Sequence, residues 1–304
     1  MLPNKFWNEW EPRVSFPTFK GVENLISFTP DLSLNRKTTR EFALPLYYLW
    51  KKQKSLKSVI KNFQWLIVSP KLRFRGALLS RDGTLLSPIN FEGEYGPGDI
   101  FTANVSTLMR ELNLPDEDGQ FLLIASRGRN DWINSAPGNT TVRYVGKEFI
   151  SGYRTGFFAR PLNSSQKNHY GFTGINPQVM VTDTLESAIL LINHSSNPAY
   201  TLSVNPKVRL YRNTKEFIEA DFGEIPPLGI RERSVLSLFP NAREFLAKAH
   251  GLGTTVTKVK GATLASFHIT RSLNGDSFGI EHSRPTHSYV VHYTRMKGYN
   301  KKAK

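Results

Sequence analysis

The stretch RFRGALLSRDGTLL, at residues 73–86, places an Asp-Gly pair between two short apolar runs. Asp-Gly favours the tight turns that join antiparallel strands, because both central positions of such a turn need a positive φ. Short apolar runs bounded by turn residues are typical of strands. The stretch therefore predicts a β-hairpin, and it favours a mainly β protein.

A second stretch, KVRLYRNTKEFIEA at residues 207–220, has the same order of strand, turn and strand. A Pro/Gly corner and a short helix follow each hairpin, with the first helix expected near residues 105–114. In the second helix, Asn241 and Glu244 have the spacing of a capping box, and Gly251 marks the end. The strand GQFLLIASRGR then corresponds to GATLASFHITRS. This repeated order predicts an internal duplication with low sequence identity.

The chain of 304 residues exceeds what one core usually organises, which favours two domains. Short strands with regularly spaced turns predict a β-sandwich of the immunoglobulin-like kind, with one short helix, in each copy. We expect an N-terminal arm and a basic amphipathic helix at residues 1–62, a first sandwich at 63–162, a second at 163–294 and a basic tail at 295–304. The arm is inferred from aromatic residues mixed with prolines, and the helix from apolar residues near helical spacing among several lysines.

The chain carries 40 Lys and Arg against 25 Asp and Glu, a net charge of +15. Such a balance attracts anions, although it is equally typical of an ordinary basic surface. There is no cysteine, which excludes disulfides, thiolate catalysis and cysteine-bound zinc. Glu9 and Glu11 interrupt any secretory signal, and no apolar run has the length of a membrane-spanning helix. We expect a soluble, cytoplasmic protein.

Four of the seven histidines lie within residues 261–293. Strand alternation puts His268 on the face opposite Phe267, and antiparallel pairing would bring His268, His282 and His287 within reach of one another. Three converging imidazoles suit one transition metal ion, which gives the hypothesis of a metal-dependent enzyme. The ordinary alternative is that these histidines cap strands and bind loop backbone.

Arginine and aromatic residues gather in the predicted loops of both copies. They are Arg127, Arg129, Trp132 and Arg154 in the first copy, and Arg271, Arg284 and Tyr289 in the second. Guanidinium groups bind carboxylates and phosphates through two points, and aromatic faces stack on sugars or bases. The preferred hypothesis is a non-catalytic binding or scaffolding protein, without a cofactor, that engages an anionic ligand or a protein partner.

Two alternatives to that hypothesis stay open. In one, the arginines are structural ties between loops; in the other, the positive charge serves a nonspecific nucleic-acid binder. No nucleophile elbow, phosphate-binding loop or dinucleotide fingerprint is present in the sequence.

Overall fold

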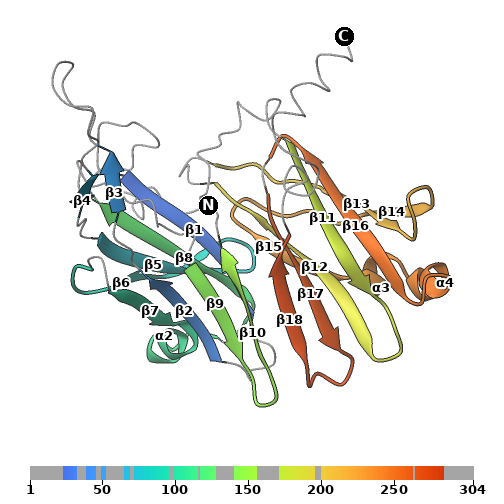
Figure 1. Ribbon diagram of the computed structural model, residues 1–304, viewed down its shortest axis with the longest axis horizontal. Coiled ribbons are helices and arrows are strands. Elements are labelled where there is room, and N and C mark those ends of the chain that lie inside the picture. The colour runs from blue at the N-terminus through green and yellow to red at the C-terminus, as the bar shows by residue number, and fades with distance from the viewer. Residues whose placement is uncertain are drawn as a thin grey trace, which may run out of the picture. The chain divides into compact units, whose positions relative to one another are not determined.

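The computed structural model describes residues 23–32, 39–45, 49–52, 65–68, 72–95, 99–115, 117–127, 140–155, 171–195, 200–262 and 264–283. Almost all of its elements are strands in antiparallel sheets (Figure 1), which confirms the expectation of a mainly β protein. The described residues fall into two compact units. One lies within Met1–Gly146 and Arg154–Pro161, and the other within Lys147–Tyr153, Leu162–Ser195 and Tyr200–Lys304.

The first unit is built on two four-stranded sheets, ordered β1-β8-β5-β6 and β10-β9-β2-β7. Residues 150–153 of β10, the edge strand of the second of these sheets, are grouped with the other unit. Their strands are β1 (Glu23–Asp31), β2 (Thr39–Pro45), β5 (Leu72–Ser80), β6 (Leu85–Asn90), β7 (Ile100–Asn104), β8 (Gly119–Arg127), β9 (Thr140–Val145) and β10 (Ile150–Thr155). Helix α2 (Val105–Glu111) follows β7, and a separate hairpin joins β3 (Leu49–Lys52) to β4 (Trp65–Val68).

Aromatic side chains join the two sheets of the first unit. The ring of Phe74 on β5 stacks on that of Phe101 on β7, with centroids 4.1 Å apart. The Tyr144 hydroxyl on β9 donates a hydrogen bond to the carbonyl oxygen of Pro30 on β1, at 2.7 Å. Since β5 and β1 belong to one sheet and β7 and β9 to the other, the two sheets pack face to face.

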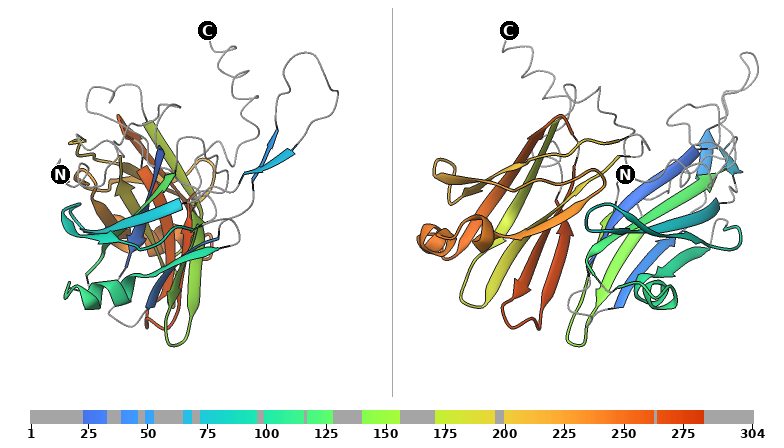
Figure 2. Two further views of the ribbon diagram at one scale, coloured as in Figure 1. Left: turned by 90° about the vertical axis from the view of Figure 1, so that its left-hand side faces the viewer. Right: turned by 180° about the vertical axis from the view of Figure 1, so that it is seen from behind.

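The second unit also has two four-stranded sheets, ordered β11-β16-β13-β14 and β15-β12-β17-β18. Its elements are β11 (Gly171–Met180), β12 (Leu185–Asn193), β13 (Lys207–Tyr211), β14 (Phe217–Asp221), β15 (Ile230–Ser234), α3 (Val235–Leu238), α4 (Ala242–Ala247), β16 (Leu252–Lys260), β17 (Leu264–Ser272) and β18 (Phe278–His282). Figure 2 shows both units from two further sides. Ile189 and Leu191 of β12 share one buried cluster with Val208 and Leu210 of β13, so these sheets also enclose a core.

The two units have the same strand order. Along the chain, β1, β2, β5, β6, β7, β8, β9 and β10 take the places that β11 to β18 take in the second unit, in both sheets. The helical segment follows the equivalent strand, β7 or β15. The sequence comparison therefore matched GQFLLIASRGR with the wrong strand, because β8 is equivalent to β16 and not to β17.

The predicted N-terminal arm and helix need correction. Residues 23–31 and 39–45 are strands of the first sandwich, paired with β8 and with β7 and β9 respectively. Pro30 and Pro45 obscured the strand pattern, yet Pro30 lies on an edge strand and Pro45 at a strand end, where proline is tolerated. Leu49–Lys52 form a strand where the helix was expected to begin, and residues 53–64 lie outside the described part of the chain.

Several local predictions are confirmed. The β5–β6 hairpin forms around Asp82-Gly83, although only Gly83 has a positive φ, of 80°, and Asp82 does not. Helix α2 forms where expected, and the side chain of Asn104 caps it by accepting a hydrogen bond from the Thr107 amide. Helix α4 follows Asn241, but that side chain makes no capping hydrogen bond, and Gly251 lies beyond its end with a φ of 78°. Among the described residues no helix combines the length and apolar character needed to cross a bilayer.

Candidate functional site

Most of the predicted ligand-binding residues cannot be placed as side chains. Arg129, Trp132, Arg284, Tyr289 and the proposed metal ligand His287 lie outside the described residues. Arg127 ends β8 and Arg154 lies in β10, and for these two only the backbone is described. The structure therefore leaves the proposed arginine and aromatic loops as a prediction.

The side chain of Arg271 is described, and it is held by an acid. Its Nη1 atom lies 2.9 Å from Oε1 of Glu232, whose side chain is only 14% exposed. Glu232 comes from β15 and Arg271 from β17, on either side of β12. For this residue the structure favours the alternative in which an arginine ties strands together.

The predicted convergence of His268 and His282 is wrong. The β17–β18 register pairs His268 with Glu281 and Phe267 with His282. Because neighbouring residues of a strand point to opposite faces, the two imidazoles lie on opposite sides of the sheet. Within the described ranges no three His, Asp or Glu side chains are grouped so that they could hold a metal ion.

His268 instead forms a short polar chain with its neighbours. Its Nδ1 atom is 3.1 Å from Ser283 Oγ, and its Nε2 atom is 3.2 Å from Glu281 Oε2. Burial lowers the pKa of His268, and the Glu281 carboxylate offsets part of that change. Although a serine, a histidine and a carboxylate also make up hydrolase triads, Ser283 is 2% exposed. We therefore assign the contacts of His268 with Ser283 and Glu281 a structural role in linking β17 to β18.

A pocket of about 410 Å³ opens in the first unit where β5 and β6 part. Their pairing ends at Arg75 opposite Asn90, and the chain then leaves the ladder. The pocket is lined by Phe74, Arg75, Asn90, Phe91, Gly93 and Glu94. Its volume lies within the range of about 300–1,000 Å³ that is typical of small-molecule sites.

The aromatic wall of this pocket is supported by the core. Phe74 is 1% exposed and stacks on Phe101, and the ring of Phe91 meets Phe101 edge-on at 4.8 Å. Tyr95 packs edge-on against Phe74 at 5.3 Å. Aromatic pairs in these geometries stabilise by about 0.5–1.5 kcal/mol each beyond the area they bury. The wall is thus preorganised by side chains from both sheets.

Two glycines shape the pocket for different reasons. A Cβ atom on Gly76 would lie 2.9 Å from a ring carbon of Phe121 and 3.1 Å from one of Phe91, so only glycine lets both rings rest on β5. Gly93 has open space around it but a φ of 92°, a backbone conformation that side chains disfavour. Gly76 therefore sets the position of the aromatic wall, and Gly93 sets the path of the chain beside it.

The lining combines the groups that a polar ring-shaped ligand needs. Arg75 is half-buried and supplies a planar cation, while Asn90 and Glu94 are exposed and supply an amide and a carboxylate. A guanidinium group binds phosphate or carboxylate through paired hydrogen bonds, and a phenyl face accepts a ring. The pocket thus places a guanidinium group, an amide and a carboxylate beside an aromatic wall.

Sequence reasoning missed this site. The available signal was the spacing of Phe74, Phe91, Tyr95 and Phe101 around a Gly-rich corner at residues 93–98. Such a group of aromatic residues indicates a core, but it does not by itself show that a pocket opens beside it.

No protein-family model matches this chain, and no curated protein matches it. Three solved structures with a weak likeness are a glycosyl hydrolase family 2 member from Bacteroides cellulosilyticus DSM 14838, a calcium binding mutant of Bacteroides uniformis beta-glucuronidase 2, and a putative beta-galactosidase from Bacteroides fragilis. Their identities to this chain are 8%, 8% and 12%, with TM-scores of 0.19, 0.22 and 0.18. The matches cover 87%, 91% and 88% of this chain but only 28%, 27% and 32% of those chains. Likeness at this level carries no argument about fold or function.

Proposed function

We propose that this chain is a non-catalytic binding protein and that its first unit holds an anionic ligand in the aromatic pocket. The observation that carries the proposal is the placement of Arg75 beside Phe74 and Phe91 in one concave site. The net charge of +15 supports it, because a basic protein raises the local concentration of anions. The ligand is either a free small molecule or an acidic group on a protein partner.

The polar lining narrows the ligand class. Arg75 would bind a phosphate or carboxylate, and Phe91 would stack on a ring. Glu94 would repel a second acidic group and accept a hydrogen bond from a hydroxyl or ammonium group. The proposed ligand therefore carries one acidic group, a ring and at least one donor.

Isothermal titration with phenyl phosphate tests the proposal, because this probe joins a ring to a phosphate. We expect the unaltered protein to bind it and Arg75→Gln to bind it at least tenfold more weakly, since a hydrogen bond to a charged group contributes about 1.5–3 kcal/mol. Phe91→Leu should also weaken binding by removing the ring face.

Arg110→Gln is the matched control, because it removes the same charge from an exposed position on α2. Its affinity for phenyl phosphate should equal that of the unaltered protein. Equal affinity in Arg75→Gln and Arg110→Gln, or no binding to the unaltered protein, would overturn the proposal. Phenol, which has the ring without the phosphate, should bind more weakly than phenyl phosphate.

We also propose that the two units arose by internal duplication and that the protein acts in the cytoplasm. The shared strand order supports the duplication. An experimental structure with different strand orders in the two units would contradict it. Cell fractionation tests the location, and recovery in a membrane or extracellular fraction would refute it.

A further inference from the structure

One sheet of the second unit presents an aromatic and basic surface on the side away from its core. Three pairs lie directly opposite each other on β13 and β14: Lys207 with Asp221, Arg209 with Glu219, and Tyr211 with Phe217. These residues alternate along β13 with Val208 and Leu210, which belong to the buried core. Their side chains therefore lie on the outer face of the sheet, together with those of Lys258 and Lys260 on β16. We call these eight residues the β13–β14 face.

Aromatic side chains occupy one end of the β13–β14 face. The rings of Tyr211 and Phe217 lie 5.1 Å apart, and Cζ of Arg209 lies 4.6 Å from the centre of the Phe217 ring. Phe217 is 43% exposed. The Arg209 Nε atom donates a hydrogen bond of 2.6 Å to Glu219, which holds the guanidinium group in place. The two rings are tilted by 38° to each other, and the Phe217 ring is partly open to solvent.

Lysines occupy the other end. Lys207 lies directly opposite Lys258 in the β13–β16 register, and Lys260 follows two residues along the same face. Like charges in this position destabilise a sheet. Lys207 is partly neutralised by Glu219 at 3.6 Å and Asp221 at 3.9 Å. Lys258 and Lys260 are exposed, and no ion pair to another described residue is seen for either.

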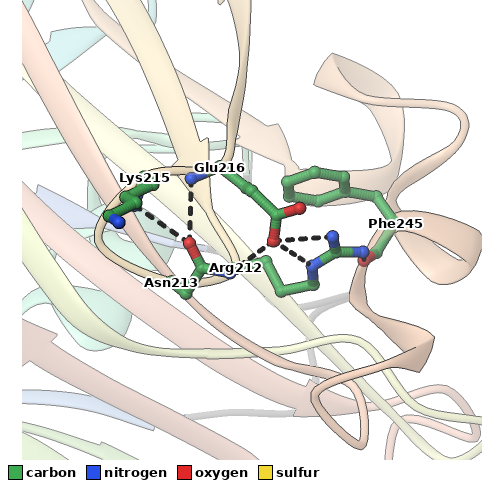
Figure 3. A network of polar contacts seen from close by, with 5 residues as sticks. All are labelled: Arg212, Asn213, Lys215, Glu216 and Phe245. Carbon is green, nitrogen blue, oxygen red and sulfur yellow. Dashed lines mark hydrogen bonds and ion pairs between the residues drawn. The ribbon is translucent and has the colours of Figure 1, made fainter.

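The turn next to the aromatic end is fixed by its own polar contacts (Figure 3). The Arg212 guanidinium lies 2.7 Å from the Glu216 carboxylate and donates a hydrogen bond of 3.1 Å to the carbonyl oxygen of Phe245 on α4. The Asn213 side chain accepts hydrogen bonds from the backbone amides of Lys215 and Glu216, both at 2.9 Å. A turn tied in this way holds the ends of β13 and β14 together, so the aromatic pair is preorganised.

We propose that the β13–β14 face binds single-stranded nucleic acid. Bases would stack on Phe217 and Tyr211, and backbone phosphates would lie on Lys258 and Lys260. A four-residue step along β13 spans roughly 13 Å, which suits roughly the two or three nucleotides that other four-stranded RNA-binding sheets stack. Aromatic platforms beside cations are the usual way of binding single strands without sequence preference.

Charge complementarity favours this occupant over an acidic protein segment. Four cations and two carboxylates lie on the face, and both carboxylates are held by Lys207 or Arg209. The remaining cations, Lys258 and Lys260, lie on the same face as the exposed Phe217 ring. An acidic peptide would use the lysines but would gain little from the ring, whereas a nucleic acid would use both.

Fluorescence anisotropy of the full chain with labelled oligo(dT) and oligo(rU) tests the inference. Phe217→Leu keeps an apolar side chain of similar size and removes the ring. We expect it to weaken binding by about tenfold or more, because stacking of one base on an aromatic ring is worth about 5- to 150-fold in affinity. Equal affinity for the two oligomers would show that the face binds single strands without distinguishing deoxyribose from ribose.

The lysines are tested by the salt dependence of binding. The first double variant combines Lys258→Gln with Lys260→Gln. In it, the slope of log affinity against log salt concentration should become shallower by about 1.4, since each contact to a single-strand phosphate contributes about 0.7. Arg243→Gln with Lys248→Gln removes the same charge from exposed positions of α4 and its end. This control should retain the slope of the unaltered protein.

Three outcomes would overturn the inference. They are no binding of either oligomer, unaltered affinity in Phe217→Leu, and an equal change of slope in the two double variants. Competition by polyglutamate at the same concentration as oligo(dT) would instead identify an acidic protein segment as the occupant. Unchanged thermal unfolding of each variant ensures that the face, and not the fold, is altered.

Discussion

Replacing Gly76 with alanine tests the packing that shapes the aromatic pocket. The added Cβ atom would lie 2.9 Å from a ring carbon of Phe121 and 3.1 Å from one of Phe91. Carbon atoms pack best at about 3.5–4.0 Å, so the nearer ring must move by about 0.6 Å. Overpacking of this kind costs about 1–3 kcal/mol, and the stiffer unfolded chain returns about 0.4–1 kcal/mol. We expect a net loss of about 1–2 kcal/mol.

Gly279→Ala is the matched control, because Gly279 is also in a strand and its Cβ atom would meet only the Thr270 carbonyl oxygen at 3.6 Å. This variant should be more stable than the unaltered protein by about 0.4–1 kcal/mol. Urea unfolding followed by circular dichroism measures both changes. Gly76→Ala should also bind phenyl phosphate more weakly, since Phe91 is displaced. If Gly76→Ala is as stable as Gly279→Ala, our account of the aromatic wall is incorrect.

Four further substitutions test interactions elsewhere. Arg40→Met removes the buried ion-pair partner of Asp31 and should lower the free energy of unfolding in urea by about 3–5 kcal/mol. Arg143→Met breaks an exposed ion pair with Glu41 and should lower it by less than about 1 kcal/mol. Equal losses in the two variants would contradict the burial of the first pair. Asn193→Ala removes a buried amide that donates to the backbone carbonyl groups of Leu202, Ile225 and Pro226. We expect the free energy of unfolding to fall by about 2 kcal/mol or more, since these acceptors lose their partner. A smaller loss, measured by thermal unfolding, would show that the amide does not hold these segments together. Because burial lowers the pKa of His268 in the folded state, the unfolded state binds protons more readily, and the free energy of unfolding should fall as pH drops below about 6.5. His268→Gln should reduce the difference between urea unfolding at neutral and at mildly acidic pH, and an unchanged difference would exclude His268 as its source.

Local signals in the sequence were sufficient for the hairpins and for helix α2. Asp-Gly at residues 82–83 and Asn104 before an apolar run act through backbone φ and capping, which depend only on near neighbours. The N-terminal strands gave no such signal. β1 and β2 are strands because β8, β7 and β9 offer them hydrogen-bonding partners far along the chain. Pairing between distant strands is a tertiary property, so the propensities of residues 23–45 could not show it.

The candidate sites depended on register, which the sequence does not specify. A shift of one residue in the β17–β18 pairing would put His282 opposite His268, but the observed register puts Glu281 there. Likewise, Arg75 and Phe91 share a pocket because the β5–β6 ladder stops at Asn90. The hairpin itself was predictable from its turn. The point at which its strands separate follows from the packing of Phe91 on Phe101 across the two sheets.

The strand order of the first unit has a consequence for synthesis on the ribosome. Its first strand pairs with β8, and the Tyr144 hydroxyl closes on the Pro30 carbonyl 114 residues earlier in the chain. At about 5–20 residues per second, roughly 5 to 20 seconds pass between the synthesis of these two residues. Until β7 is made, β2 has no partner, and until β8 is made, β1 has none, so each is an unpaired edge on the nascent chain to which other strands can add. The demand for protection by chaperones is therefore greatest before β8 and β9 emerge.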